Sequence, residues 1–197
     1  MALVDNFDSY NDGDLNGQGG WSGSVAYDVQ TSVVYSGPKA VSATIGSGGI
    51  RISKSITPET NGSQIAYQRV STGSSGGSYF EIWSSGTRIA VFGFDAGASK
   101  IYLYYLTGGG LSNVEILYPY SADTWYKFEL EWNSTNNQVR ARINDGSWFG
   151  WYNCDAFGDI DTVSLFNSEG IITGYFDSFS DPNAPPPAVG KSQGLII

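Results

Sequence analysis

The sequence predicts an all-β protein built as a two-sheet antiparallel β-sandwich, and three observations favour this fold class. Gly is abundant (26 of 197 residues), aromatics make up 15%, and strand-favouring residues outweigh strong helix formers. Short runs alternate apolar and polar residues with the period of a strand. Segments rich in Gly, Ser, Asn and Asp, which suit hairpin turns, separate these runs. Because this many short strands cannot all pair in one flat sheet, we expect two sheets packed face to face.

The alternating runs place the expected strands along nearly the whole chain and leave almost no room for helices. At this length, one domain is expected, covering residues 1–181, followed by a Pro-rich extended tail at 182–197. The expected strands are residues 2–7, 24–30, 39–45, 50–56, 64–70, 79–84, 88–94, 100–106, 114–118, 125–132, 138–144, 162–167 and 174–180.

The first turn signal, "DGDLNG" at residues 12–17, has the spacing with which a calcium-binding loop begins. Asp12, Asp14 and Asn16 occupy alternate positions, but the last ligand position of that pattern, which needs a bidentate Glu, holds Gly23. The flanking helices of such a loop are also not expected here. The stretch is therefore interpreted as a turn of the β-fold rather than as a calcium loop.

The run "WYKFELEW" and the following run "QVRARIN" form the clearest expected hairpin. Matching their apolar faces brings Glu129 and Glu131 opposite Arg140 and Arg142 on the outer face, where we expect exposed ion pairs. The opposite face is expected to be buried and consists of Tyr126, Phe128, Leu130, Trp132, Val139, Ala141 and Ile143.

Composition excludes several classes of function. The net charge of −9 and the absence of a Lys/Arg cluster argue against nucleic acid and against anionic membranes as partners. The chain has no His, which excludes His-dependent triads, His-ligated zinc and imidazole switching. Cys154 is the only cysteine, so no internal disulfide forms, and a small buried thiol is expected.

The N-terminal sequence "MALVDNF" has neither the basic nor the apolar region of a signal peptide. No stretch approaches the length of a membrane span. Unless a precursor was trimmed, we expect synthesis in the cytoplasm without export by a cleaved signal.

Three stretches resemble a known group of proteins. "ADTWYKFELEWNSTNNQVRARINDGSW", with the opening "LVDNFDSYNDGDLNGQGGW" and the closing "GIITGYFDSFSD", is similar to concanavalin A-like, laminin-G-like jelly-roll domains of the lectin/glucanase superfamily. The resemblance spans roughly residues 3 to 181. It implies a jelly roll in which the opening stretch crosses an edge and Trp21 caps the core.

The resemblance also implies one structural calcium ion between the first and last strands, because related jelly rolls often hold a cation there. The positions that look like its ligands are Asp177, Gly37 and Asp5, which supply the oxygen ligands that calcium prefers. The alternative is that the aspartates cap turns or accept hydrogen bonds from backbone amides.

Some members of the group are glycosidases with a strand reading E-x-D-x-x-E. The nearest run here is "ELEWNS", in which Glu129 and Glu131 have suitable spacing but the third position is Ser134. The expected arginine partners favour ionised carboxylates, whereas a general acid must keep its proton at neutral pH. We therefore expect no catalysis, and glycoside hydrolysis is a remote alternative.

Aromatic side chains are the candidate ligand-binding residues, since aromatic rings stack on the C–H faces of sugars. Trp148, Trp151 and Tyr152 cluster just past a turn, and Tyr102 and Tyr104 share one face of an expected strand. The alternative is that these rings close the ends of the core.

The tail is the candidate docking element for neighbouring subunits of an assembly. Pro185, Pro186 and Pro187 favour an extended conformation, and the chain ends with the apolar residues Leu195, Ile196 and Ile197. A non-catalytic, lectin-like domain displayed on a larger assembly, such as a virion decoration or fibre protein, fits this tail and the missing signal. A free glycan-binding module is the alternative.

Overall fold

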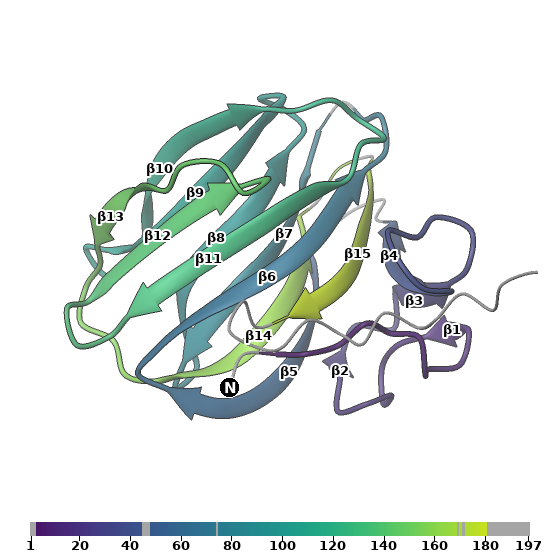
Figure 1. The fold of residues 1–197 in the computed structure, drawn as a ribbon, viewed down its shortest axis with the longest axis horizontal. Coiled ribbons are helices and arrows are strands. Elements are labelled where there is room, and N and C mark those ends of the chain that lie inside the picture. The colour runs from purple at the N-terminus through teal and green to yellow at the C-terminus, as the bar shows by residue number, and fades with distance from the viewer. Residues whose placement is uncertain (1–2, 45–47, 74, 169, 171, 181–197) are drawn as a thin grey trace, which may run out of the picture.

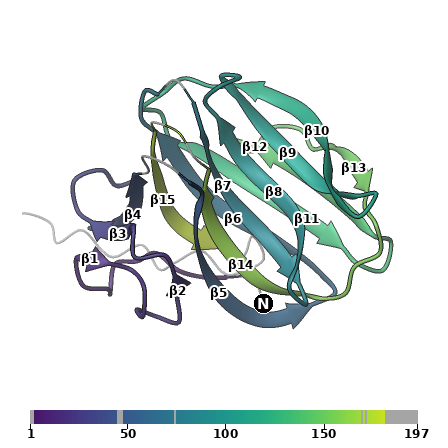
Figure 2. The same cartoon turned by 180° about the vertical axis from the view of Figure 1, so that it is seen from behind.

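The computed structural model describes residues 3–44, 48–73, 75–168, 170 and 172–180, and within these ranges the chain is an all-β sandwich of two antiparallel sheets. The eight-stranded sheet faces the viewer in Figure 1, and the seven-stranded sheet is seen from its own side in Figure 2. In the described part of the chain, no helix has the length and hydropathy of a membrane span. The predicted boundary of the tail at residues 181 and 182 lies outside the described residues.

The strand order within each sheet is far from the order along the chain. The eight-stranded sheet runs β1 (Gly13–Asp14), β3 (Tyr27–Gln30), β4 (Ala40–Thr44), β15 (Thr173–Ser180), β6 (Asn61–Val70), β11 (Tyr126–Asn133), β12 (Gln138–Ile143) and β13 (Phe149–Asn153). The seven-stranded sheet runs β10 (Gly110–Pro119), β9 (Lys100–Thr107), β8 (Thr87–Asp95), β7 (Gly77–Ser84), β14 (Ile160–Asn167), β5 (Ile50–Glu59) and β2 (Ser22–Gly23).

Most expected strands are confirmed, and the differences are as follows: the two-residue strands β1 and β2 were not predicted, and β10 is longer than the predicted 114–118. Of the expected strand at residues 2–7, the described residues 3–7 contribute only an isolated bridge from Asp5 to Phe179, and Phe7 has a φ of +61°, which does not continue a strand. β5 and β6 are both longer than predicted. β13 was missed, since its Trp and Gly residues read as a turn-flanking cluster rather than as an alternating run.

The core lies between the two sheets and has the predicted inner face of the hairpin at its centre. Phe128 of β11 meets Phe92 and Phe94 of β8 edge-to-face, with ring centroids 4.8 and 5.1 Å apart. The seven apolar residues predicted for this face are all buried, with at most 7% of their surface exposed. The alternation in the sequence therefore assigned both faces of this hairpin correctly.

The opening stretch forms a turn, as predicted, in which polar side chains bind backbone amides. Asp14 Oδ1 accepts a hydrogen bond from the Asn16 amide (2.8 Å), and Asn16 Oδ1 accepts one from the Gly23 amide (3.0 Å). Leu15 and Trp21 are buried in the core, so the segment also caps the sandwich.

Candidate functional site

A cavity of about 500 Å³ opens on the outer face of the eight-stranded sheet, over β6 and β11. Because side chains alternate along a strand, β11 buries Phe128 and Leu130 in the core and turns Glu129 and Glu131 outward. β6 pairs with β11 in a register that sets Ser63 opposite Glu131. The cavity is lined by Asn61, Gly62, Ser63, Glu129, Glu131, Trp132, Asn133 and Arg142.

Glu129 lies at the floor of this cavity and is bound by Arg142, its predicted partner on β12. Arg142 Nε and Nη2 each lie 2.7 Å from Glu129 Oε2, and Ser63 Oγ lies 3.4 Å from Oε1. The side chain of Glu129 is only 4% exposed, whereas that of Arg142 is 26% exposed. The register prediction is confirmed, but the prediction of an exposed pair is wrong for Glu129, since Arg142 and the neighbouring strand β6 cover its carboxylate.

The second pair joins Glu131 to Arg140 at the same face. Arg140 Nε and Nη2 lie 2.8 and 2.7 Å from Glu131 Oε2, and both side chains are 27% exposed. The Glu131–Arg140 pair is the more open of the two and leaves Glu131 Oε1 and further guanidinium N–H groups able to meet a ligand, whereas Glu129 Oε1 already accepts from Ser63 Oγ. The face thus offers both acceptors and donors to a neutral polar molecule.

Two tryptophans lie beside these pairs: Trp148 just before β13 and Trp151 within it. The guanidinium carbon of Arg140 lies 4.3 Å from the Trp148 ring centroid and 4.5 Å from that of Trp151, and Arg142 lies 4.5 Å from Trp148. These cation–π contacts tie both indoles to the arginines that hold the glutamates. Trp151 is 37% exposed, so part of its ring remains open to a ligand.

The other three aromatic candidates lie elsewhere. Tyr152 is opposite Val139 in the β12–β13 register, and its ring stacks on Tyr105 with centroids 5.1 Å apart, at the rim of the core. Tyr102 and Tyr104 stack on each other on the outer face of β9, in the seven-stranded sheet. The structure therefore brings two of the five predicted rings, Trp148 and Trp151, to the arginines beside the cavity.

Several residues of this face were missed by the sequence reasoning. Asn61 and Ser63 reach the cavity only because β6 pairs with β11, two strands separated by a long stretch of sequence. A group of three rings, Tyr35, Tyr67 and Trp125, lies at the other end of the same face. The outward position of Tyr67 follows from the alternation in β6, but nothing in the sequence places the loop residue Tyr35 against it.

Asp177, a predicted cation ligand, is fully buried and accepts hydrogen bonds from backbone amides. Its Oδ2 accepts from the amides of Tyr35 (2.8 Å) and Ser36 (3.0 Å), and its Oδ1 accepts from Ser178 Oγ (3.0 Å). Burial raises the pKa of the Asp177 carboxyl above its ordinary value, while these hydrogen bonds oppose the rise. Its contacts are those of the alternative interpretation, an aspartate that fixes a loop.

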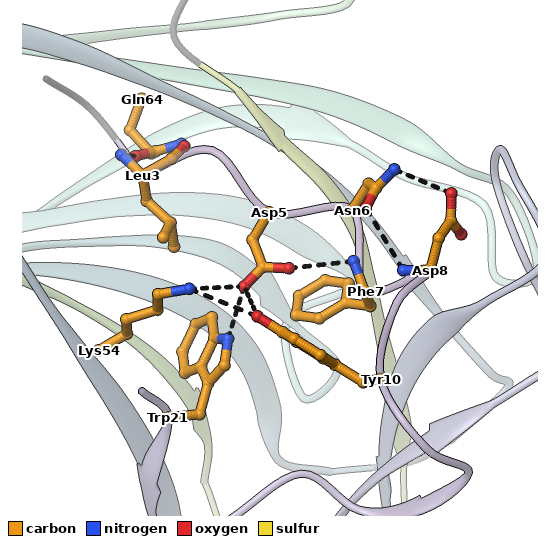
Figure 3. A network of polar contacts seen from close by, with 9 residues as sticks. All are labelled: Leu3, Asp5, Asn6, Phe7, Asp8, Tyr10, Trp21, Lys54 and Gln64. Atoms are coloured by element: carbon orange, nitrogen blue, oxygen red, sulfur yellow. Dashed lines mark hydrogen bonds and ion pairs between the residues drawn. The ribbon is translucent and has the colours of Figure 1, made fainter. Parts of the chain in front are cut away.

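Asp5, the second predicted ligand, is the centre of a separate network of donors (Figure 3). Its Oδ2 accepts from Tyr10 Oη (2.6 Å), Trp21 Nε1 (2.9 Å) and Lys54 Nζ (2.9 Å), and its Oδ1 accepts from the Phe7 amide (3.0 Å). Burial, together with Asp5, raises the pKa of the Tyr10 hydroxyl. Both carboxylate oxygens of Asp5 thus already face N–H or O–H donors.

Gly37, the third predicted ligand, adopts a φ of +67°, and a Cβ there would collide with the carboxylate of Asp8. Over the described ranges, no group of three or more His, Cys, Asp or Glu side chains is arranged to hold a metal ion. The carboxylates of Asp5 and Asp177 do not fit a calcium site as they stand, because donors occupy them. The calcium ion stays a prediction.

No protein-family model matches the sequence, and no curated protein matches it. Solved structures are similar at low identity. A sialidase matches with a TM-score of 0.71 and 10% identity over 92% of this chain, which spans only 18% of the sialidase chain. The carbohydrate binding module CBM66 from Bacillus subtilis matches with a TM-score of 0.56 and 10% identity, over 82% of this chain and 94% of that module.

A third similar structure is the GH16 protein of a Bacteroides ovatus mixed-linkage glucan locus, in complex with its G4G4G3G product. Its TM-score is 0.61 and its identity 12%, over 91% of this chain and 99% of that chain. At these identities the likeness shows the fold alone. The predicted fold is confirmed: the chain is an antiparallel two-sheet sandwich with the concanavalin A-like jelly-roll fold.

Proposed function

We propose that this domain binds carbohydrate, without cleaving it, in the cavity on the outer face of the eight-stranded sheet. One observation carries the proposal: Glu129, Glu131 and Arg142 line a cavity, and Arg140, which binds Glu131, also lies over the partly exposed ring of Trp151. Paired carboxylates and guanidinium groups match the hydroxyl groups of a sugar, and an indole matches its C–H face. Similar structures include a carbohydrate binding module and a glucan-degrading enzyme, which supports this class of ligand.

The absence of catalysis is proposed from the partners of the two carboxylates. In a glycosidase, one carboxyl group donates a proton and the other attacks or activates water. Here Arg142 contacts Glu129 Oε2, and Arg140 contacts Glu131 Oε2, each through two guanidinium nitrogens, so both carboxylates are held in place by structural partners. The position that carries the third carboxylate in the glycosidase pattern is Ser134.

Calorimetric titration tests the binding proposal. The probes are the G4G4G3G tetrasaccharide and tetrasaccharides of β-xylan, β-mannan and β-galactan. We expect one of these to bind, and Trp151→Ala to weaken its affinity at least fivefold without changing the melting temperature. The matched control is Tyr118→Ala, which removes a comparably exposed ring (42%) from the other sheet.

Two results would contradict the proposal. If none of the probes binds, the proposal that this face recognises carbohydrate is wrong. Release of reducing ends from any of the four polysaccharides, lost in the double variant Glu129→Gln/Glu131→Gln, would show that the domain is an enzyme.

Display of the domain on a larger particle, such as a virion, is a second proposal and is supported by the sequence alone. It depends on Pro185–Pro187 and Leu195–Ile197 of the tail, which lie outside the described residues. Synthesis in the cytoplasm followed by assembly onto the particle belongs to the same proposal. Deletion after Asp181 should leave melting unchanged but abolish incorporation into the assembly, and unaltered incorporation would refute docking through the tail.

A further inference from the structure

Tyr35, Tyr67 and Trp125 form a second aromatic cluster on the same outer face as the cavity. The Tyr35 and Tyr67 rings stack with centroids 3.7 Å apart and an interplanar angle of 16°, and Trp125 meets Tyr35 edge-on at 5.9 Å. Tyr35 is 44% exposed, which makes it one of the few exposed large apolar side chains among the described residues. Its stack with Tyr67 occupies one side of the ring, so the exposed surface is available to a flat apolar partner.

The position of this cluster follows from the strand register. On β6 and β11 the outward pairs are Ser63 with Glu131 at the cavity and Tyr67 with Lys127 at the cluster. Four residues separate the two pairs along each strand, which corresponds to about 13 Å at the rise of an antiparallel strand. One sugar ring cannot span this separation, whereas several linked sugar residues can.

The exposed ring of Tyr35 is held in place by the backbone rather than left on a free loop. The buried carboxylate of Asp177 accepts the amide hydrogen bonds of Tyr35 and Ser36, and Ser36 Oγ lies 2.8 Å from Ser178 Oγ. These contacts join the loop to β15, the strand that pairs with β6 beside Tyr67. A ring fixed in this way loses little conformational entropy when it stacks on a ligand.

Between the cluster and the cavity, β6 contributes the buried Ile65 and β11 contributes a charged residue. Lys127 lies between Trp125 and Glu129 on the outer face of β11, and its Nζ lies 2.5 Å from Asp145 Oδ1. Its side chain is 20% exposed and that of Asp145 is 62% exposed. The face therefore presents rings at one end, a charged pair next to them, and the two arginine–glutamate pairs with Trp151 at the other end.

From this arrangement we propose that Tyr35, Tyr67 and Trp125 are a second sugar-binding position, and that the ligand is an internal stretch of a linear neutral polysaccharide. The proposal rests on the proposed function of the cavity, and specifies its ligand as a chain rather than a single terminal sugar. The balance of two arginines against two glutamates at the cavity favours a neutral chain over a charged one. Asp177 acts as a positioning residue that holds Tyr35 for stacking.

The test is the dependence of affinity on chain length, measured by calorimetry with oligosaccharides from disaccharide to heptasaccharide. The probes are the linear series of mixed-linkage β-glucan, β-xylan, β-mannan and β-galactan. For the native protein we expect affinity to rise with length for the series that binds, until the chain reaches both positions. Tyr35→Ala should lower the affinity for the longest oligosaccharide roughly tenfold, about 1.4 kcal/mol, while leaving the shortest unchanged.

Two matched variants make the result specific. Tyr35→Phe keeps the ring and should retain the gain with length, whereas Trp151→Ala should weaken short and long oligosaccharides alike. The two proposals fail in different ways. If no oligosaccharide of any length binds, both are wrong. If a disaccharide binds as tightly as a heptasaccharide, or if Tyr35→Ala behaves as the native protein, the second position is wrong and binding at the cavity stands.

Discussion

The unequal burial of Glu129 and Arg142 predicts that removing the arginine destabilises the domain more than neutralising the glutamate. Arg142→Met leaves a carboxylate that is 4% exposed without its partner, which should cost roughly 3 to 5 kcal/mol of unfolding free energy. Glu129→Gln leaves an arginine that is 26% exposed, still reached by water and still able to bond the new amide. Its cost should be about 1 kcal/mol.

The neighbouring pair supplies a matched control. Glu131 and Arg140 are both 27% exposed; Arg140→Met loses cation–π contacts with Trp148 and Trp151, and Arg142→Met loses one with Trp148. The coupling energy of this pair in a double-mutant cycle should be roughly 0 to 1 kcal/mol, as for exposed ion pairs. The coupling of the Glu129–Arg142 pair should exceed it.

Urea denaturation followed by tryptophan fluorescence measures both cycles, with the slope on denaturant checked for constancy in every variant. The reasoning is refuted if Arg142→Met costs no more than Glu129→Gln. It is equally refuted if the coupling energy at Glu131 and Arg140 equals that at Glu129 and Arg142. Either result would mean that water reaches Glu129 as freely as it reaches Glu131.

Three further predictions concern the core, a buried acid and calcium. Phe128→Ala removes a fully buried ring and should lower the unfolding free energy by roughly 3 to 5 kcal/mol, with an unchanged melting temperature as the contradicting result. Burial raises the pKa of Asp177 above its ordinary value of 3.8, so the protonated carboxyl stabilises the folded state. This contribution to the free energy of unfolding is complete below pH 3.8 and is lost as the pH rises through the folded-state pKa. Asp177→Asn lacks this contribution. The difference in unfolding free energy between the native protein and this variant should therefore shrink from acid to neutral pH. A difference that does not change with pH would contradict a raised pKa of Asp177 as its cause. Calcium added to chelator-treated protein should raise the melting temperature by less than about a degree, since donors occupy Asp5 and Asp177, and a rise of several degrees would show that they rearrange around the ion.

The sequence predicted those parts of the fold in which the local pattern of residues is compatible with only one structure. In the 126–143 hairpin, a shift of one residue would expose Phe128 and bury Arg142, so the alternation determines both faces and the register. The turn at Asp14 and Asn16 follows equally from short polar side chains that reach nearby amides. Neither inference needs knowledge of distant strands.

The candidate site depended on contacts that local pattern does not contain. The alternation gave the outward direction of Glu129 but not its burial, which requires β6 beside β11 and Arg142 above the carboxylate. Tyr102 and Tyr104 do share one face of their strand, as predicted, but this strand belongs to the opposite sheet from the cavity. Which sheet a strand joins is decided by pairings between residues far apart in the chain, and a single sequence does not reveal them.

The position of β15 in the middle of the eight-stranded sheet affects how the domain forms during synthesis. β4 pairs with β3 on one side and with β15 on the other, and β15 is also the neighbour of β6. A nascent chain that has emerged only as far as β14 therefore has two separate pieces of this sheet, each with an open edge. Closure must wait until residues 173–180 leave the ribosome, and pairings between strands so far apart in the chain form slowly. Until then the exposed strand edges of β4 and β6 are the sites at which chaperones, or misplaced pairing with another chain, would act.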